Sequence, residues 1–198
     1  MEDVLWPPGQ PALPLSVLLD DVATQHDEVG CNLDDAAEAV LRITRAGAMV
    51  SPAKCKFAVK TTRHLGDKWT LGGYWRPPDG KISALLELDE QSLASMPRAQ
   101  LFGMLGYWRD YVPDFAARTQ RLRHLLRGDA APWTPAHTEE FRATVQALVD
   151  SAPMINFDPL EPVVLEMHTG PKGLAAVYLQ QDPAGGRWLP VAAYSRPL

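Results

Sequence analysis

The sequence has few cysteines and no long apolar segment, and both absences restrict where the protein can work. Cys31 and Cys55 are its only cysteines among 198 residues, and they form no C-x-x-C pair. A disulfide framework is therefore not expected, and a reducing compartment suits the chain better. No apolar run approaches the roughly 20 residues of a membrane-spanning helix. The acidic start Met1-Glu2-Asp3 does not resemble a signal peptide. We expect a soluble intracellular protein with no membrane partner.

A net positive charge is also missing. The formal net charge is −5 at pH 7, while the hydrophobic fraction (46%) and the charged fraction (22%) are ordinary for a globular protein. Nucleic-acid binding would therefore need a local basic patch. The candidate patch is a group of arginines in a stretch with few acids: Arg98, Arg109, Arg118, Arg121, Arg123 and Arg127. These arginines can equally form the ordinary solvated face of two helices.

The acidic pair Asp20-Asp21 is the one arrangement in the sequence that suits metal-ion chemistry. It follows an irregular lead-in, residues 1–14, which contains four prolines. Residues 15–19 and 22–24 are expected to form a short hairpin around the pair. Two carboxylates at a hairpin tip can hold a divalent ion, because hard oxygen ligands suit Mg²⁺. The pair can instead mark a simple turn, in which both side chains hydrate or cap the backbone.

A well-marked helix is predicted over residues 34–46. Asn32 or Asp34 can cap its start, and Gly47 is expected to stop it. The strand-like segments that follow are short: 48–51, 56–59, 64–66 and 68–71.

From residue 80 the apolar spacing becomes helical. The predicted helices are 81–88, 97–111, 119–127 and 134–150. After Pro153 the pattern becomes β again, and Gly185-Gly186 is expected to turn the chain before the last strand. The three predicted strands form a meander: 163–167, 174–180 and 188–194.

Several short motifs follow one another along the chain: L-L-D-D at 18–21, V-S-P-A-K-C-K-F at 50–57, H-L-G at 64–66 and the longer segment 101–116. Taken in this order, they resemble the Pol proteins of Ty3/gypsy-type retrotransposons. Leu18-Leu19-Asp20-Asp21 is similar to the Y-x-D-D motif of the polymerase palm, and residues 50–57 are similar to its S-P-x-K-C-x-F segment. Residues 64–66 resemble an F-L-G strand, and residues 101–116 resemble the thumb/connection signature. The motifs similar to the RNase H end are W-T-P at 133–135, S-A-P at 151–153, F-D-P at 157–159 and A-A-Y-S-R at 192–196. The resemblance covers about residues 15–198 in unbroken order.

The resemblance implies an α+β fold in three parts after the lead-in at 1–14. They are a palm hairpin remnant at 15–79, helical thumb/connection elements at 80–152, and a truncated three-stranded RNase H-like β-meander at 153–198. It also implies that Asp20 and Asp21 are catalytic ligands for Mg²⁺. The family's third aspartate and fingers region would precede Met1, so we expect no polymerase activity and no bound Mg²⁺ in the isolated chain.

The RNase H part departs from the family at its first catalytic aspartate, whose position falls at His168. A neutral imidazole does not replace a carboxylate in a Mg²⁺ site, because Mg²⁺ prefers oxygen ligands. The remaining acidic ligands would follow Leu198, so ribonuclease activity is not expected. The other histidines show no zinc spacing and are expected to be surface or packing residues: His26, His64, His124 and His137.

We therefore expect a fragment of a retroelement reverse transcriptase/RNase H, of the RNA-directed DNA polymerase lineage, that is inactive in isolation. An enzymatic role would need a second chain to complete the site. The alternatives are a noncatalytic module that binds an RNA–DNA hybrid, or one that binds a partner protein through the truncated sheet. Arginine suits phosphate binding because its planar fork pairs two oxygens, and such binding is expected to be weak and salt-sensitive. Trp108 and Tyr111 are expected in the core rather than at a stacking surface.

Overall fold

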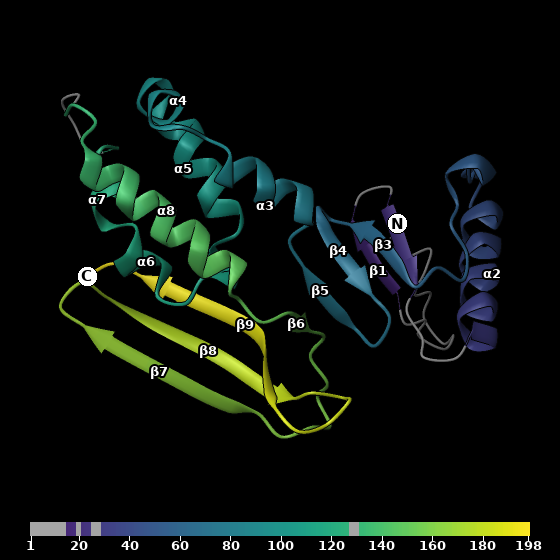
Figure 1. Ribbon diagram of the computed structural model, residues 1–198. Coiled ribbons are helices and arrows are strands. Elements are labelled where there is room, and N and C mark those ends of the chain that lie inside the picture. The colour runs from purple at the N-terminus through teal and green to yellow at the C-terminus, as the bar shows by residue number, and fades with distance from the viewer. Residues whose placement is uncertain (1–14, 19–20, 25–28, 127–130) are drawn as a thin grey trace. The chain divides into compact units, whose positions relative to one another are not determined.

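The computed structural model describes residues 15–18, 21–24, 29–126 and 131–198 (Figure 1). The chain divides into two compact units, residues 1–74 and 75–198. Strand β5 (Tyr74–Arg76) crosses the division. Helices and antiparallel sheets both contribute, so the predicted α+β class is confirmed. None of the helices in the described part of the chain combines the length and apolar character needed to cross a membrane.

The first unit begins with the predicted hairpin. β1 (Leu15–Leu18) and β2 (Asp21–Thr24) pair antiparallel, with Leu18 opposite Asp21. The strands differ from the predicted bounds by one residue each. Asp20 lies outside the described residues.

Helix α2 (Val29–Arg45) is longer than predicted, because it starts five residues before Asp34. The expected caps Asn32 and Asp34 are therefore wrong: both lie inside the helix, and no proline precedes them to prevent the extra turn. The predicted stop is confirmed. Gly47 adopts φ +84°, and the N–H of Ala48 donates to the carbonyl of Ile43 at 3.2 Å, which is the pattern of a glycine-terminated helix.

The strands predicted at 48–51 and 56–59 are not formed. The chain instead makes the short 3₁₀ turn η1 (Pro52–Lys54), and Ala58 takes a positive φ that does not fit a strand. Almost all of this segment is exposed, so no core face selects an extended pairing. β3 (Thr61–His64) and β4 (Asp67–Thr70) then form an antiparallel hairpin.

The turn of that hairpin uses an uncommon residue. Leu65 and Gly66 have φ values of +53° and +85°, as a two-residue type I′ turn requires. The predicted segment 64–66 is thus a strand end plus a turn rather than a strand.

The second unit contains a layer of helices, seen in teal and green in Figure 1. They are α3 (Asp79–Leu86), α4 (Glu90–Ser95), α5 (Arg98–Tyr107), the 3₁₀ turn η2 (Arg109–Tyr111), α6 (Phe115–Arg118), α7 (Gln120–His124) and α8 (Pro135–Val149). The helix predicted at 97–111 stops at Tyr107 and continues as η2. Helices α4 and α6 were not predicted, because each is too short to show a helical apolar repeat.

Helix α8 is the center of this layer and has the predicted ends. Thr134 caps its start, and Asp150 follows its end. Phe141, Val145 and Leu148 point into the core at the predicted spacing and are almost fully buried. Trp108 and Tyr111 are buried in the same cluster, so their expected core position is confirmed.

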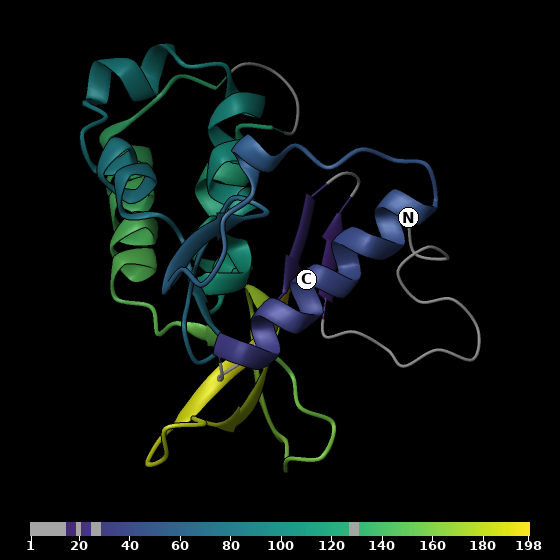
Figure 2. The ribbon, with the colours of Figure 1, turned by 90° about the vertical axis from the view of Figure 1, so that its right-hand side faces the viewer.

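The helical layer packs on one side of a three-stranded sheet. β7 (Val164–Gly170), β8 (Gly173–Gln181) and β9 (Trp188–Arg196) are antiparallel in the order β7-β8-β9, as predicted. The short strand β6 (Met154–Ile155), which was not predicted, precedes them. Helix α6 contacts β8 and β9. Figure 2 shows the helices of this unit gathered on one side of the sheet.

A bulge divides the sheet into two regions. The register shifts between Tyr178 and Leu179, after which Gln180 pairs with Leu189. Gln180 is buried, and its amide bonds to the backbone of Asp158 (2.9 and 2.7 Å) and Glu161 (3.1 Å). The loop before β7 is thereby fixed to this end of the sheet.

Candidate nucleic-acid interface

Arg98 and Arg123, two of the predicted phosphate ligands, are used inside the helical layer. The Arg98 guanidinium lies 5.1 Å from the ring center of Trp133 and donates to the carbonyl of Ala94 at 3.1 Å. The Arg123 guanidinium lies 5.7 Å from the ring center of Phe102. Both side chains are half-buried. Cation–π contacts of this kind hold the guanidinium against the protein, so these two arginines have a structural role.

Arg118 and Arg121 are exposed at the junction of α6 and α7. The Nε–H of Arg118 donates to the carbonyl of Pro113 at 2.8 Å, which fixes the stem of the side chain. The backbone N–H groups of Arg121 and Leu122 donate to the carboxylate of Glu140 at 3.2 and 2.8 Å. Glu140 therefore caps α7 and places a negative charge close to these arginines.

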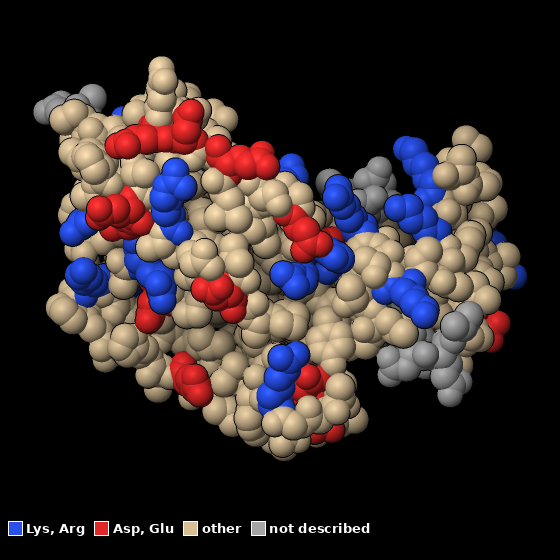
Figure 3. All heavy atoms as spheres, viewed as in Figure 1, with Lys and Arg blue, Asp and Glu red and all other residues tan. Residues whose placement is uncertain are grey.

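The last two predicted arginines add little to a basic patch. Arg109 is exposed and lies 3.5 Å from the carboxylate of its neighbor Asp110. Arg127 lies outside the described residues. On the face shown in Figure 3, acidic and basic side chains of the helical part are interspersed. The helical layer therefore presents mixed charge on this face.

A second group of cations, in the first unit, was not among the predicted ligands. Lys54, Lys56, Lys60 and Arg63 are exposed, and Arg63 pairs in register with Lys68 across the β3–β4 hairpin. The sequence does contain a signal for this group. Between residues 39 and 74 the only acid is Asp67, against seven bases: Arg42, Arg45, Lys54, Lys56, Lys60, Arg63 and Lys68. A charge count over the whole chain hides this local excess. We call Lys54, Lys56, Lys60, Arg63 and Lys68 the basic segment.

The predicted metal ligands are only partly described. Asp21 is the first residue of β2, and Asp20 and the Asp21 side chain are outside the described part of the structure. Among the side chains that the structure does describe, no three His, Cys, Asp or Glu residues gather in a way that could hold a metal ion.

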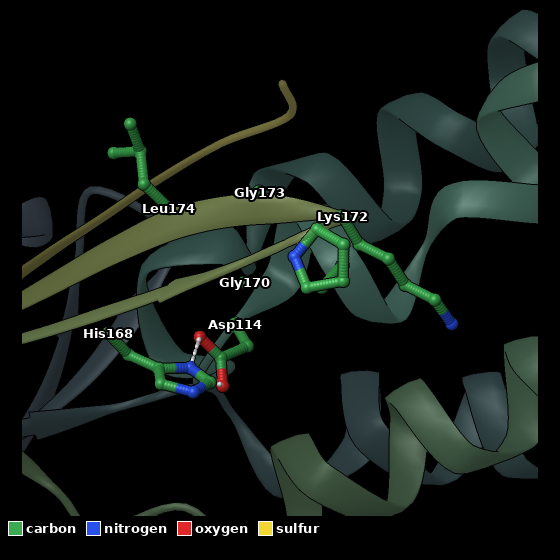
Figure 4. Close-up of a pocket in the computed structure, with 8 residues that line it drawn as sticks. Asp114, His168, Gly170, Lys172, Gly173 and Leu174 are labelled. Carbon is green, nitrogen blue, oxygen red and sulfur yellow. Dashed lines mark hydrogen bonds and ion pairs between the residues drawn. The ribbon is translucent and has the colours of Figure 1, made fainter.

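His168, which the sequence resemblance sets at the position of a catalytic aspartate, lies on β7 and faces Asp114 (Figure 4). Its Nδ1 is 3.2 Å from each carboxylate oxygen of Asp114. Asp114 itself precedes α6 with a left-handed backbone, φ 53° and ψ 31°. The pair lines a pocket of about 270 Å³ beside the β7–β8 turn, and Lys172 of that turn extends away from the pair in Figure 4.

The described histidines other than His168 serve packing or surface roles, as predicted. His64 is buried with its ring 5.3 Å from that of Trp69, at an angle of 84°. His124 is exposed on α7. The Nδ1 atom of His137 accepts the N–H of Thr134 at 3.0 Å and so completes the start of α8. His26 lies outside the described residues.

Comparison with known proteins finds a family match within the second unit. Residues 133–198 match the model of the RNase H-like domain found in reverse transcriptase. These residues include α8 and the whole β7–β9 sheet. The expected likeness to the RNase H-like domain of a reverse transcriptase is therefore confirmed for these residues.

A wider match includes most of the chain. The Gag-Pol polyprotein of Walleye dermal sarcoma virus is 24% identical over 184 residues, which are 91% of this chain and 10% of that polyprotein. The chain thus resembles a fragment of a retroviral Gag-Pol polyprotein that includes the RNase H-like domain of reverse transcriptase. It spans about a tenth of the length of this curated relative.

Solved structures show the same fold. A foamy viral protease-reverse transcriptase dRH in complex with double-stranded DNA matches with a TM-score of 0.77 and 22% identity, over 99% of this chain and 33% of that one. A foamy viral protease-reverse transcriptase in complex with an RNA/DNA hybrid matches with a TM-score of 0.75 and 21% identity, over 100% of this chain and 26% of that one.

Proposed function

We propose that this chain is a noncatalytic nucleic-acid-binding module of reverse transcriptase origin, and that its ligand is an RNA–DNA hybrid or a related duplex. The motif order, from Leu18-Leu19-Asp20-Asp21 to the A-A-Y-S-R of β9, further supports a Ty3/gypsy-type source. The fold neighbors that were solved with double-stranded DNA and with an RNA/DNA hybrid support the class of ligand.

The observation that carries the proposal is the basic segment of the first unit. Its side chains are mostly exposed, and a single acid lies among them. Lysine and arginine bind phosphates largely by neutralising charge and releasing counterions. If each of the five side chains neutralises one phosphate, the logarithm of the binding constant should fall with the logarithm of salt concentration with a slope of roughly −4.5. Arg118 and Arg121 are the candidates in the second unit.

The test is a titration of the full chain against a short RNA–DNA hybrid, with duplex DNA alongside, at two salt concentrations. Replacement of Lys54, Lys56 and Lys60 by glutamine should weaken binding and reduce the salt slope by about three, because three phosphate contacts are lost. Replacement of Arg118 and Arg121 by alanine measures the contribution of the helical layer. The matched control replaces three cations outside both groups: Lys81, Lys172 and Arg196.

The outcomes separate clearly. Binding that falls with salt and is weakened by the basic-segment variant, but not by the control, supports the proposal. Equal losses of affinity in the basic-segment variant and in the control variant would indicate a response to net charge alone. That result would reject the basic segment as the site. No binding at low salt would reject the function.

We also propose that the chain does not cleave the hybrid and binds no catalytic Mg²⁺ at the sheet. The support is chemical: His168 presents imidazole nitrogen where the related domain has a carboxylate, and Mg²⁺ prefers oxygen ligands. The test incubates a labelled RNA–DNA hybrid with the protein and Mg²⁺. Glu166 is the acid nearest to His168 along the same strand face. Cleavage that is lost in the Glu166→Gln variant would contradict the proposal that the chain does not cleave the hybrid. For the acidic pair, Asp21→Asn should leave Mg²⁺ binding by the chain unchanged.

A further inference from the structure

Strand β7 is an edge strand without the usual protection. It pairs with β8 on one side, and no described strand pairs with its other side. Its side chains are exposed on both faces, and Met167 is 75% exposed. Proteins commonly protect such an edge with lysine, proline or a bulge. Residues 164–170 contain none of these, and the register shift of the sheet lies between β8 and β9 instead.

The hairpin fixes which backbone groups face the open edge. Gly170 and Gly173 close a two-residue connection between β7 and β8, and the pair that closes such a connection is hydrogen-bonded. In an antiparallel ladder, bonded and nonbonded pairs alternate. The backbone groups of Glu166 and His168 therefore face β8. Those of Leu165, Met167 and Thr169 face away from it.

We propose that β7 pairs antiparallel with β7 of a second copy of this chain, with the twofold axis at Met167. In this register Met167 faces Met167 of the other copy, and the outward N–H and C=O groups of the two residues bond each other. Leu165 lies opposite Thr169 in the same way. The outward N–H and C=O groups of the two strands bond each other only if the twofold axis passes through an outward-facing residue or midway between two such residues.

The charges select this register among its neighbors. With the axis at Met167, Glu166 of each copy lies opposite His168 of the other, on the face that carries Asp114. Opposite residues of an antiparallel pair share one face, so two complementary Glu–His pairs form. An axis at Glu166 would set glutamate against glutamate, and like charges directly opposite destabilise a pair. An axis at His168 would place Glu166 opposite Gly170, so that neither Glu–His pair would form.

This pattern is the reason to choose a second copy as the occupant. One strand supplies both members of each complementary pair, which is the property of a self-complementary twofold interface. The carboxylate of Asp114 lies 3.2 Å from Nδ1 of His168 and holds the imidazole on this face, where the glutamate of the other copy lies. Asp114, His168 and Lys172 line the pocket beside the β7–β8 turn, and Glu166 lies on the same strand as His168.

The first experiment is sedimentation of the full chain over a range of concentrations, with Met167→Pro as the key variant. Proline removes an N–H that faces the open edge, so the β7–β8 ladder is kept and the pairing between copies is lost. We expect the wild-type chain to dimerise and Met167→Pro to weaken the dimer about tenfold or more. Circular dichroism checks that the variant folds.

Two further variants distinguish association through the edge of β7 from association through the face of the sheet. Glu166→Lys sets a cation against His168 of the other copy and should also weaken the dimer. Tyr194→Lys alters the exposed face of β9 and should leave the dimer intact. Amide hydrogen exchange gives an independent measurement. The amides of Leu165, Met167 and Thr169 should gain protection with concentration in the wild-type chain only.

A monomer at every soluble concentration would overturn the proposal. So would a dimer that survives Met167→Pro, or one that Tyr194→Lys abolishes. Open-ended fibers instead of dimers would reject the closed twofold pair. These outcomes do not depend on nucleic-acid binding, because the basic segment shares no residue with β7.

Discussion

The imidazole of His168 on β7 and the carboxylate of Asp114 before α6 form a two-contact pair, with Nδ1 3.2 Å from both oxygens. The pair joins the helical layer to the edge strand of the sheet, where the two layers otherwise share few contacts. Its side chains are 74% and 35% exposed. Solvent screening therefore limits its strength, and its main effect is to orient His168.

We expect His168→Ala to lower the free energy of unfolding by less than about 1 kcal/mol, because contacts between exposed polar side chains contribute little to stability. His168→Asp should cost more, because it sets two carboxylates against each other. Urea denaturation at neutral pH measures both. His124→Ala, on the surface of α7, is the control and should change stability by no more than about 0.5 kcal/mol. Equal stability of the His168→Asp and His168→Ala variants would contradict the pairing.

Trp133 connects the start of α8 to α5. Its Nε1–H donates to Oγ1 of Thr138 at 2.8 Å, and Arg98 lies over its ring. Trp133→Phe should lower the unfolding free energy by about 1–2 kcal/mol, because the hydroxyl of the buried Thr138 loses its donor. Trp188→Phe changes a more exposed indole and serves as the matched control. If both variants unfold at the same denaturant concentration, the Trp133 contact contributes no stability.

Asp89 caps α4, and its contribution should depend on pH. Hydrogen bonds from the side chain and the backbone N–H of Ser92 stabilise the carboxylate and hold the Asp89 pKa below its ordinary value of 3.8. A depressed folded-state pKa gives stability that is present above the unfolded value and is lost as pH falls through the folded one. Asp89→Ala should therefore destabilise the protein at pH 7, and the difference from wild type should shrink below about pH 4. Denaturation curves between pH 2 and 7 test this; a difference independent of pH would argue against a charged cap.

The core of the second unit should be sensitive to truncation at Phe141. This side chain is 1% exposed in the cluster under α8. Phe141→Ala should cost about 3–5 kcal/mol through lost burial and the cavity left behind. Phe157→Ala removes the same atoms from a side chain that is 58% exposed and should cost much less. Comparable losses at the two sites would show that the cluster is not the main core.

Two glycines should respond in opposite directions to alanine. Gly47 ends α2 with φ +84° and Gly103 lies inside α5, with open space at each position for a methyl group. Gly47→Ala should cost about 1 kcal/mol, because an L side chain resists the left-handed region. Gly103→Ala should stabilise α5 by about 0.5–1 kcal/mol through higher helix propensity. Hydrogen exchange in α2 and α5 measures each locally, and a stabilising Gly47→Ala would reject the terminating role.

Sequence patterns predicted the long elements well and the short ones poorly. Helix α8 and the three strands of the sheet were found because Phe141, Val145 and Leu148 repeat over several turns and each strand is long enough to show its pattern. Helices α4 and α6 have six and four residues, and tertiary packing decides their conformation. The segment after α2 contains apolar residues such as Met49 and Phe57, but they are exposed and have no core to pack against. Its predicted strands therefore did not form.

The candidate site shows a similar division. The arginine group was visible in the sequence, but only the structure shows that Arg98 and Arg123 are held against aromatic rings. The Asp114–His168 pair joins residues 54 positions apart, and no local pattern indicates it. The basic segment could have been found by counting charge over a window rather than over the chain. Its role in binding stays a prediction.

The bulge of the sheet has a consequence for how the chain tolerates insertions and deletions. Tyr178 pairs with Ala192 but Leu179 pairs with Pro190, so Val191 is the extra residue of β9. Removing it would restore a regular ladder in which Leu179 still pairs with Pro190 and Gln180 still pairs with Leu189. A substitution at Val191 changes one side chain. Its deletion would remove the bend and extra twist that a bulge gives its strand, and so would change the angle at which Gln180 holds the loop at Asp158 and Glu161.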